Sequence, residues 1–220
     1  MIFNETVTVL DNVEISKNIY EAHLSSNLIS SASKPGQFIN ILPSSVFNYT
    51  MRRPMSISYQ DDKKIKIIYK PVGPGTKMMS NWRKGDKVDI IGPLGNFWKY
   101  KGEKDVILIG GGVGIAPIMN LYNQIKDKIS TSLFIGARTK DEHFLVHQPN
   151  NGIYISTDDG TAGIKGNLYD AINSTYNVNE IKGKTLYVCG PPIMMEVMRI
   201  FSLKYNLKCY LALETIMACG

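Results

Sequence analysis

The first hundred residues of the chain alternate apolar and polar positions in short runs. Alternation with a period of two is typical of strands that bury one face, and turn-forming groups such as SKPG, DDKK and KGD separate the runs. This spacing predicts a small antiparallel β-barrel. The predicted strands are 6–10, 19–24, 36–42, 55–59, 64–70 and 87–92.

The pattern changes after Gly102. Short apolar runs now alternate with longer segments in which apolar positions recur at helical spacing. That alternation predicts a parallel sheet with helices packed on its faces, so we expect a β-barrel domain over 1–100 and an α/β domain over 101–220. The predicted strands are 105–110, 131–137, 152–157, 185–190 and 209–214, and the predicted helices are 117–126, 167–176 and 193–205.

Composition favours an ordinary globular protein, with 44% hydrophobic and 20% charged residues. The net charge of +6 comes from 25 basic and 19 acidic residues, and the basic ones are scattered through turns such as 61–64 and 181–184. A nucleic-acid binder more often gathers its basic residues on one face, so we predict no nucleic-acid partner. A positive balance helps at most to attract anionic cofactors or an acidic partner protein.

The apolar runs are shorter than a membrane-spanning helix requires, and the N-terminus has no basic head followed by an apolar run. We therefore expect no membrane association. The three cysteines, at 189, 209 and 219, do not form the paired framework of small secreted domains. A reducing, cytoplasmic location is the expectation.

The first segment with candidate chemistry is RRPMSIS, residues 52–58. Pro54 fixes Arg53 in an extended conformation, and the planar guanidinium of Arg53 can donate two hydrogen bonds at once to a pyrophosphate. The hydroxyl of Ser56 can reach a polar ring atom. The alternative is an edge strand with a solvated arginine pair, and these residues alone favour that alternative.

A second segment, YKPVGPGTKMMSNW at 69–82, contains a glycine-rich turn. The backbone amides around Gly75, with Thr76 and Lys77 beside them, can cradle a phosphate at the start of a short helix. A plain surface loop is an equally good interpretation.

A third segment, DVILIGGGVGIAPIMNL at 105–121, joins a buried strand to a helix through glycines. Gly110, Gly112 and Gly114 let the backbone approach a dinucleotide, and we expect Pro117 to be the first helical residue. The motif differs from GxGxxG because Pro117 stands where the last glycine would be.

Two further turns follow predicted strands of the sheet. Cys189 and Gly190 end one strand, and Asp158 follows another, which places all three at the carboxyl edge where α/β proteins bind ligands. A buried core cysteine is the common alternative for Cys189. For Asp158, a ligand-binding turn and a surface turn remain equally good.

The order of these motifs along the whole chain resembles the ferredoxin–NADP reductase superfamily. Within it, the segments RRPMSIS, GTKMMS, GGGVGIAPI, TDDGTAGIKG and LETIMACG are most similar to the electron-transfer subunits of type B dihydroorotate dehydrogenases. The resemblance implies FAD bound across the barrel and NAD bound by the second domain. The implied FAD residues are Arg53, Pro54, Met55, Ser56, Tyr69, Lys70, Gly75, Thr76 and Lys77, and the implied NAD residues are Gly112, Gly114, Asp158, Cys189 and Gly190.

The same resemblance gives a meaning to the final residues. In that family, the sequence ACG begins a loop with three further cysteines that hold a 2Fe-2S cluster, which implies that Cys219 is the first of four ligands. We therefore expect a truncated sequence that does not bind the cluster as it stands. Ser56 is implied to lie near the reactive flavin nitrogen, and Glu214 is a weaker candidate for a residue near the ring.

The implied activity is electron transfer in pyrimidine biosynthesis. Electrons would pass from a dihydroorotate dehydrogenase catalytic subunit, in a heterotetramer, through the 2Fe-2S cluster and FAD to NAD+. One alternative is the small subunit of an NADH-dependent ferredoxin:NADP oxidoreductase or of a sulfide dehydrogenase. Another is a non-catalytic flavin-binding assembly subunit.

The choice between NAD and NADP depends on the segment GARTKDE, which ends the second strand of the α/β half. Arg138 favours an additional phosphate, whereas Asp141 and Glu142 repel one. We expect NAD.

Overall fold

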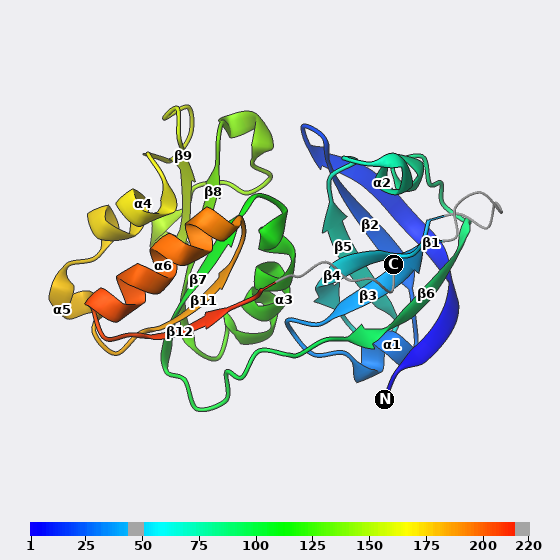
Figure 1. The fold of residues 1–220 in the computed structure, drawn as a ribbon, viewed down its shortest axis with the longest axis horizontal. Helices are drawn as coiled ribbons and strands as arrows, with labels where there is room; N and C mark the ends of the chain where they lie inside the picture. The colour runs from blue at the N-terminus through cyan, green and yellow to red at the C-terminus, as the bar shows by residue number, and fades with distance from the viewer. Residues whose placement is uncertain (44–50, 214–220) are drawn as a thin grey trace. The chain divides into compact units, whose positions relative to one another are not determined.

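The computed structural model describes residues 1–43 and 51–213. These form two compact units, Met1–Trp98 and Lys99–Leu213, drawn in Figure 1. Within the described residues, no helix is long and apolar enough to cross a membrane.

The first unit is a closed antiparallel barrel in the order β1-β2-β5-β4-β3-β6, which confirms the predicted fold of this half. Two short helices, α1 (Leu28–Ala32) and α2 (Pro74–Met79), lie between strands. The strands are β1 (Phe3–Ser16), β2 (Ile19–Ser25), β3 (Phe38–Leu42), β4 (Arg53–Gln60), β5 (Lys64–Tyr69) and β6 (Lys87–Leu94).

Alternate apolar positions fill the barrel. Ile39 and Ile41 of β3, Ile57 of β4, and Ile65 and Ile67 of β5 are fully buried. Their β-branched side chains suit a pleated surface, and the intervening positions of β3 face away from this core. The period of two in the sequence is therefore the period of the barrel wall.

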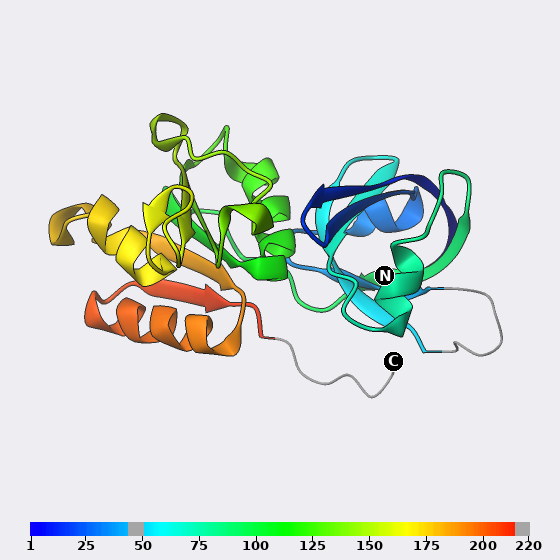
Figure 2. The same ribbon diagram turned by 90° about the horizontal axis from the view of Figure 1, so that it is seen from above.

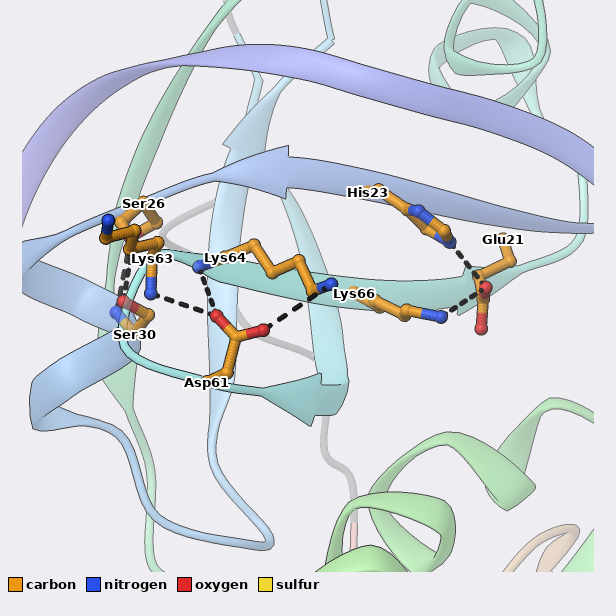
Figure 3. A network of polar contacts seen from close by, with 8 residues as sticks. All are labelled: Glu21, His23, Ser26, Ser30, Asp61, Lys63, Lys64 and Lys66. Atoms are coloured by element: carbon orange, nitrogen blue, oxygen red, sulfur yellow. Dashed lines mark hydrogen bonds and ion pairs between the residues drawn. The ribbon is translucent and has the colours of Figure 1, made fainter.

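Polar pairs cover part of the outer surface of β2 and β5 (Figure 3). Glu21 Oε1 lies 2.6 Å from His23 Nε2 and accepts a hydrogen bond from Lys66 Nζ at 3.0 Å. At the β4–β5 turn, Asp61 Oδ1 accepts a hydrogen bond from the backbone amide of Lys64 at 2.9 Å, and Asp61 Oδ2 forms an ion pair with Lys64 Nζ at 3.5 Å. These scattered basic residues thus have local acidic partners.

The second unit is a parallel sheet in the order β10-β9-β8-β7-β11-β12, as the alternation of strands and helices predicts. Its strands are β7 (Asp105–Gly111), β8 (Ser130–Ala137), β9 (Ile153–Thr157), β10 (Ile164–Lys165), β11 (Thr185–Cys189) and β12 (Lys208–Leu211). The helices are η1 (Gly112–Gly114), α3 (Ile115–Ile125), η2 (Lys140–Glu142), η3 (Pro149–Asn151), α4 (Leu168–Thr175), α5 (Val178–Ile181) and α6 (Pro192–Lys204).

Helices cover both faces of this sheet (Figure 2). Ile107 and Ile109 of β7 share one core cluster with residues of α4 and α6, and α3 packs against β7, β8 and β11. A strand buried on both faces reads as a continuous apolar run, and residues 106–109 are fully buried.

One local prediction about α3 is wrong. The helix begins at Ile115, after the 3₁₀ turn η1, so Pro117 is its third residue and not its first. A proline still suits this place near the helix start, because none of the first four N–H groups of a helix has an intrahelical acceptor. A proline is tolerated at any of these positions.

Candidate functional site

In the barrel, Arg53 and Gly75 lie in direct contact, although 22 positions separate them in the sequence. A Cβ added at Gly75 would lie 2.8 Å from Arg53 Nε and 3.3 Å from its Cγ. Only glycine therefore lets the arginine side chain lie across the first turn of α2. The structure brings together the guanidinium and the glycine turn that the sequence proposed as two parts of one anion site.

The two neighbouring arginines differ in how their charges are used. Arg52 forms an ion pair with Asp89 and donates to the carbonyl oxygens of Asn40 and Asp89. Arg53 donates to the carbonyl oxygens of Met51 and Arg52, and it has no acidic partner within residues 1–43 and 51–213. A planar cation without a carboxylate suits a phosphate or diphosphate.

The turn beneath Arg53 is held in shape by its own residues. The Gly73 amide donates to Thr76 Oγ1 at 3.1 Å, and Thr76 Oγ1 lies 3.1 Å from the carbonyl oxygen of Gly73. Thr76 is buried, whereas Lys77 on the last turn of α2 is exposed. Thr76 therefore supports the turn, and Lys77 adds a second positive charge beside it.

The residues after Arg53 alternate between the faces of β4. Met55 pairs with the fully buried Ile39 and packs against the barrel core, whereas Ser56 pairs with Phe38 and is half-buried. Pro54 is exposed. Ser56 therefore lies on the outward face, where its hydroxyl can contact a ligand. Met55 lies on the opposite face and packs against the barrel core.

Tyr69 is a core residue. Its side chain is 2% exposed, its ring stacks on Tyr20 at 5.7 Å, and its hydroxyl donates to Asn12 Oδ1 at 2.9 Å. Burial raises the pKa of Tyr69, which stays protonated. Contact of Tyr69, or of the half-buried Lys70, with a cofactor remains a prediction.

In the second unit, the two glycine turns meet backbone to backbone. A Cβ at Gly114 would lie 2.6 Å from Gly190 Cα and 2.7 Å from the carbonyl carbon of Cys189. A Cβ at Gly111 would lie 2.5 Å from Met194 Sδ, and one at Gly190 would meet the same side chain. The predicted nucleotide residues of β7 and β11 are therefore direct neighbours.

Gly112, in the turn after β7, is exposed and has open space beside it. Its φ of +56° lies in the left-handed region, and nothing lies within 4 Å of a Cβ built on it. The thiol-bearing residue Cys189 is only 3% exposed. The turn at Gly112 thus presents backbone, while Cys189 contributes mainly to packing beneath it.

Asp158 lies at the same edge of the sheet, directly after β9, and is exposed. Its amide donates to the carbonyl of Ala137 at the end of β8, which joins the two strand ends. Arg138 follows Ala137 and is paired with Glu142, with Nη2 2.5 Å from Oε1. The edge therefore carries charged side chains two and three strands away from β11, after β8 and β9 respectively.

Two predicted residues, Glu214 and Cys219, lie outside the described residues. Conversely, the sequence did not single out Asn12, whose Nδ2 donates to the carbonyl oxygens of Met79 and Trp82 while its Oδ1 accepts from Tyr69. Asn12 thereby ties the end of α2 to the barrel. Asn12 lies in β1 but beyond the predicted strand 6–10, so the sequence pattern carried no signal for it.

Comparison with known proteins gives these sites a context. Residues 108–199 match the family model of the oxidoreductase NAD-binding domain, a range that includes every predicted NAD residue. The electron transfer subunit of dihydroorotate dehydrogenase B (NAD(+)) from Fusobacterium nucleatum is 35% identical over 98% of this chain and 85% of its own length. The chain belongs to the family of dihydroorotate dehydrogenase B electron transfer subunits. The corresponding subunit of a Geobacillus species is 33% identical over 100% of this chain and 86% of its own.

Solved structures agree with this membership. An NADH-dependent reduced ferredoxin-NADP oxidoreductase, described for flavin-based electron bifurcation, has a TM-score of 0.85 and 26% identity, covering 97% of this chain and 78% of its own. Phthalate dioxygenase reductase shares the fold at a TM-score of 0.73 and 19% identity, covering 94% of this chain and 68% of its own. As a dihydroorotate dehydrogenase B electron transfer subunit, the chain is an oxidoreductase subunit with an NAD-binding domain.

Proposed function

We propose that this chain carries electrons between a dihydroorotate dehydrogenase catalytic subunit and NAD+ in pyrimidine biosynthesis, with FAD held by residues 1–100 and NAD by residues 101–220. The observation that carries the proposal is Arg53, whose side chain lies across Gly75 without an acidic partner in the described residues. A flavin exchanges electrons with both two-electron and one-electron carriers, which is the chemistry it would supply here.

The barrel residues would position the flavin. Arg53 would donate to its diphosphate, and the turn at Gly75, Thr76 and Lys77 would complete the phosphate site. Ser56, on the outward face of β4, offers its hydroxyl to the ring. Pro54 keeps the preceding arginine extended, and the family resemblance supports adding Met55, Tyr69 and Lys70 to the same site.

The sheet residues would position NAD. The open turn at Gly112 would let the dinucleotide approach the backbone at the start of α3, and Gly114 and Gly190 would let the turns after β7 and β11 pack closely beside it. Asp158 adds a carboxylate at the same edge. The fit to the family of NAD-binding domains over 108–199 supports this assignment.

We also propose a 2Fe-2S cluster in the full-length subunit only, with Cys219 as one ligand, together with Glu214 near the flavin ring and a heterotetramer with the catalytic subunit in the cytoplasm. Support comes from the similarity to dihydroorotate dehydrogenase B electron transfer subunits. In the assembled complex of the full-length subunit, Cys219→Ser should remove the electron paramagnetic resonance signal of the reduced cluster while FAD remains bound. A signal unchanged by the substitution would contradict the role of Cys219.

The decisive experiment adds NADH, without air, to purified protein loaded with FAD. We expect the yellow flavin absorbance to bleach and, in the full-length subunit that carries the cluster, to return when the catalytic subunit and orotate are added. Protein that binds FAD but stays yellow would favour a non-catalytic assembly subunit. This readout separates electron transfer from cofactor storage.

A second candidate function has one observation in its favour, the TM-score of 0.85 to the NADH-dependent reduced ferredoxin-NADP oxidoreductase. In that case the FAD of this chain would be reduced by NADH as before, but dihydroorotate with the catalytic subunit would not reduce it. Reduction by dihydroorotate through the partner decides between the two.

A further inference from the structure

Arg138 stands at the position from which a sheet of this kind recognises the adenosine ribose. It follows β8 directly, and β8 pairs in parallel with β7 so that Gly136 lies opposite Gly111 of the glycine turn. In such sheets, an acidic residue beyond the second strand binds the free ribose hydroxyls of NAD, whereas an arginine there accepts the 2′-phosphate of NADP. By position alone, Arg138 would favour NADP.

The guanidinium of Arg138 is already occupied. Its Nη2 lies 2.5 Å from Glu142 Oε1 and its Nε lies 3.3 Å from Oε2, so both edges of the carboxylate are used. The Arg138 amide also donates to Oε2 at 3.2 Å. Arg138 remains 78% exposed while the Glu142 side chain is 15% exposed, which means that the carboxylate lies beneath the arginine.

The turn that carries Glu142 is fixed to the neighbouring loop. The Lys140 amide, at the start of η2, donates to Thr161 Oγ1 at 2.9 Å, and the Asp159 amide donates to the Arg138 carbonyl at 3.3 Å. Thr161 in turn donates to Asp159 Oδ1 from both its amide and its hydroxyl. Glu142 is therefore held in place by the loop after β9 and is more than a transient surface partner.

The charges around Arg138 oppose the binding of a 2′-phosphate. The hydrogen bonds and charge of Glu142, and more weakly the charge of Asp158, raise the pKa of Arg138. Arg138 is thus paired directly with Glu142 and attracted more weakly by Asp158. The basic side chain of Lys140 lies on the same turn. A 2′-phosphate brings about −2 charges at neutral pH, which would have to displace Glu142 and remain beside it.

We propose that Glu142 is the residue that makes this site select nucleotides without a 2′-phosphate, by engaging Arg138 in a bidentate pair. The proposal rests on the proposed binding of NAD at the β7–β8 edge and deepens it. It assigns Glu142 the role of a specificity residue that acts through Arg138, without touching the reacting nicotinamide.

The test uses two fragments that need no flavin, 5′-AMP for NAD and 2′,5′-ADP for NADP, titrated calorimetrically. Glu142→Gln keeps the shape and removes the charge, so the affinity for 2′,5′-ADP should rise about 10-fold or more while that for 5′-AMP stays within about twofold. Glu142→Ala should act in the same direction. In FAD-loaded protein, kcat/KM for NADPH should rise in parallel with the fragment affinity.

Two further variants make the test specific. Adding Arg138→Ala to Glu142→Gln should abolish the gain, because the released arginine is what holds the phosphate. Glu196→Gln is the matched control, since Glu196 forms a similar bidentate pair with Arg199 on α6, and it should change neither affinity.

An unchanged 2′,5′-ADP affinity in Glu142→Gln would overturn the proposal while leaving the proposed function intact, provided that 5′-AMP still binds. A gain that persists without Arg138 would also overturn it, since repulsion alone would then account for selectivity. Wild-type protein that binds neither fragment would contradict the nucleotide site itself, and the specificity role with it.

Discussion

The barrel and the sheet each build a glycine turn, but the two turns work differently. At Gly75 the missing side chain makes room for a charged partner, the guanidinium of Arg53. At Gly114 it makes room for another stretch of backbone, that of Cys189 and Gly190. On the proposed function, the first turn would bind its ligand through a cationic side chain and the second through main chain, so substitutions should separate binding from folding.

The largest expected effect is at the rigid turn. Gly114→Ala places a carbon 2.6–2.7 Å from backbone atoms that cannot rotate away, so we expect the free energy of unfolding to fall by about 3 kcal/mol or more. Denaturant titration measures the change. Gly73→Ala is the control, because nothing lies within 4 Å of its added carbon and its stability should change little. Similar losses in both variants would remove the distinction between the turns.

The next effect separates the two arginines. Arg53→Ala should weaken FAD binding about 100-fold, because a charge-assisted contact to the diphosphate is lost, with little change in stability. Arg52→Ala should instead lower the free energy of unfolding by about 1–2 kcal/mol, since Asp89 loses its partner, and should keep FAD. Fluorescence titration with FAD and denaturant titration measure the two quantities. Reversed results would show that Arg52 holds the anion.

A smaller effect tests the support beneath the barrel site. Tyr69→Phe leaves Asn12 Oδ1 without its donor, and we expect a loss of about 1 kcal/mol in the free energy of unfolding. If Tyr69 only stabilises the core, FAD affinity should stay within about twofold of wild type. A larger change in FAD affinity at unchanged stability would instead support the cofactor contact implied by the family resemblance.

The smallest effect is a pH dependence confined to the barrel. Burial acts to raise the pKa of Glu5, but hydrogen bonds from the Ser26 hydroxyl and from the amides of Ile29, Leu28 and Asn27 outweigh it and hold the pKa below its usual 4.5. The stabilisation is therefore present above pH 4.5 and is lost as the pH falls through the lowered pKa. In Glu5→Gln, the free energy of unfolding should fall less steeply as the pH is lowered. An unchanged dependence on pH would contradict this role of Glu5.

Both halves of the fold were predictable from the sequence because their periods are simple. The alternation over 36–42 and 64–70 is the barrel wall itself, and the buried run over 105–110 is the central strand of the sheet. The helix start was misplaced at Pro117 because a proline is allowed at several N-terminal positions, and the preceding 3₁₀ turn has no pattern of its own.

The candidate sites were predictable as segments but not as contacts. The sequence could propose that Arg53 and Gly75 share a ligand, yet their touching depends on a barrel closed by strands far apart in the chain. The pairing of Arg138 with Glu142 was hidden for a similar reason. Sequence showed opposite charges four residues apart, and only the geometry of η2 shows that one engages the other.

The most direct test of the central claim, that Arg53 and Gly75 form the flavin diphosphate site, is a crystal structure of the protein with FAD. We expect the diphosphate within hydrogen-bond distance of the Arg53 guanidinium, above the first turn of α2. A diphosphate found elsewhere, with Arg53 still bonded only to backbone carbonyls, would contradict it.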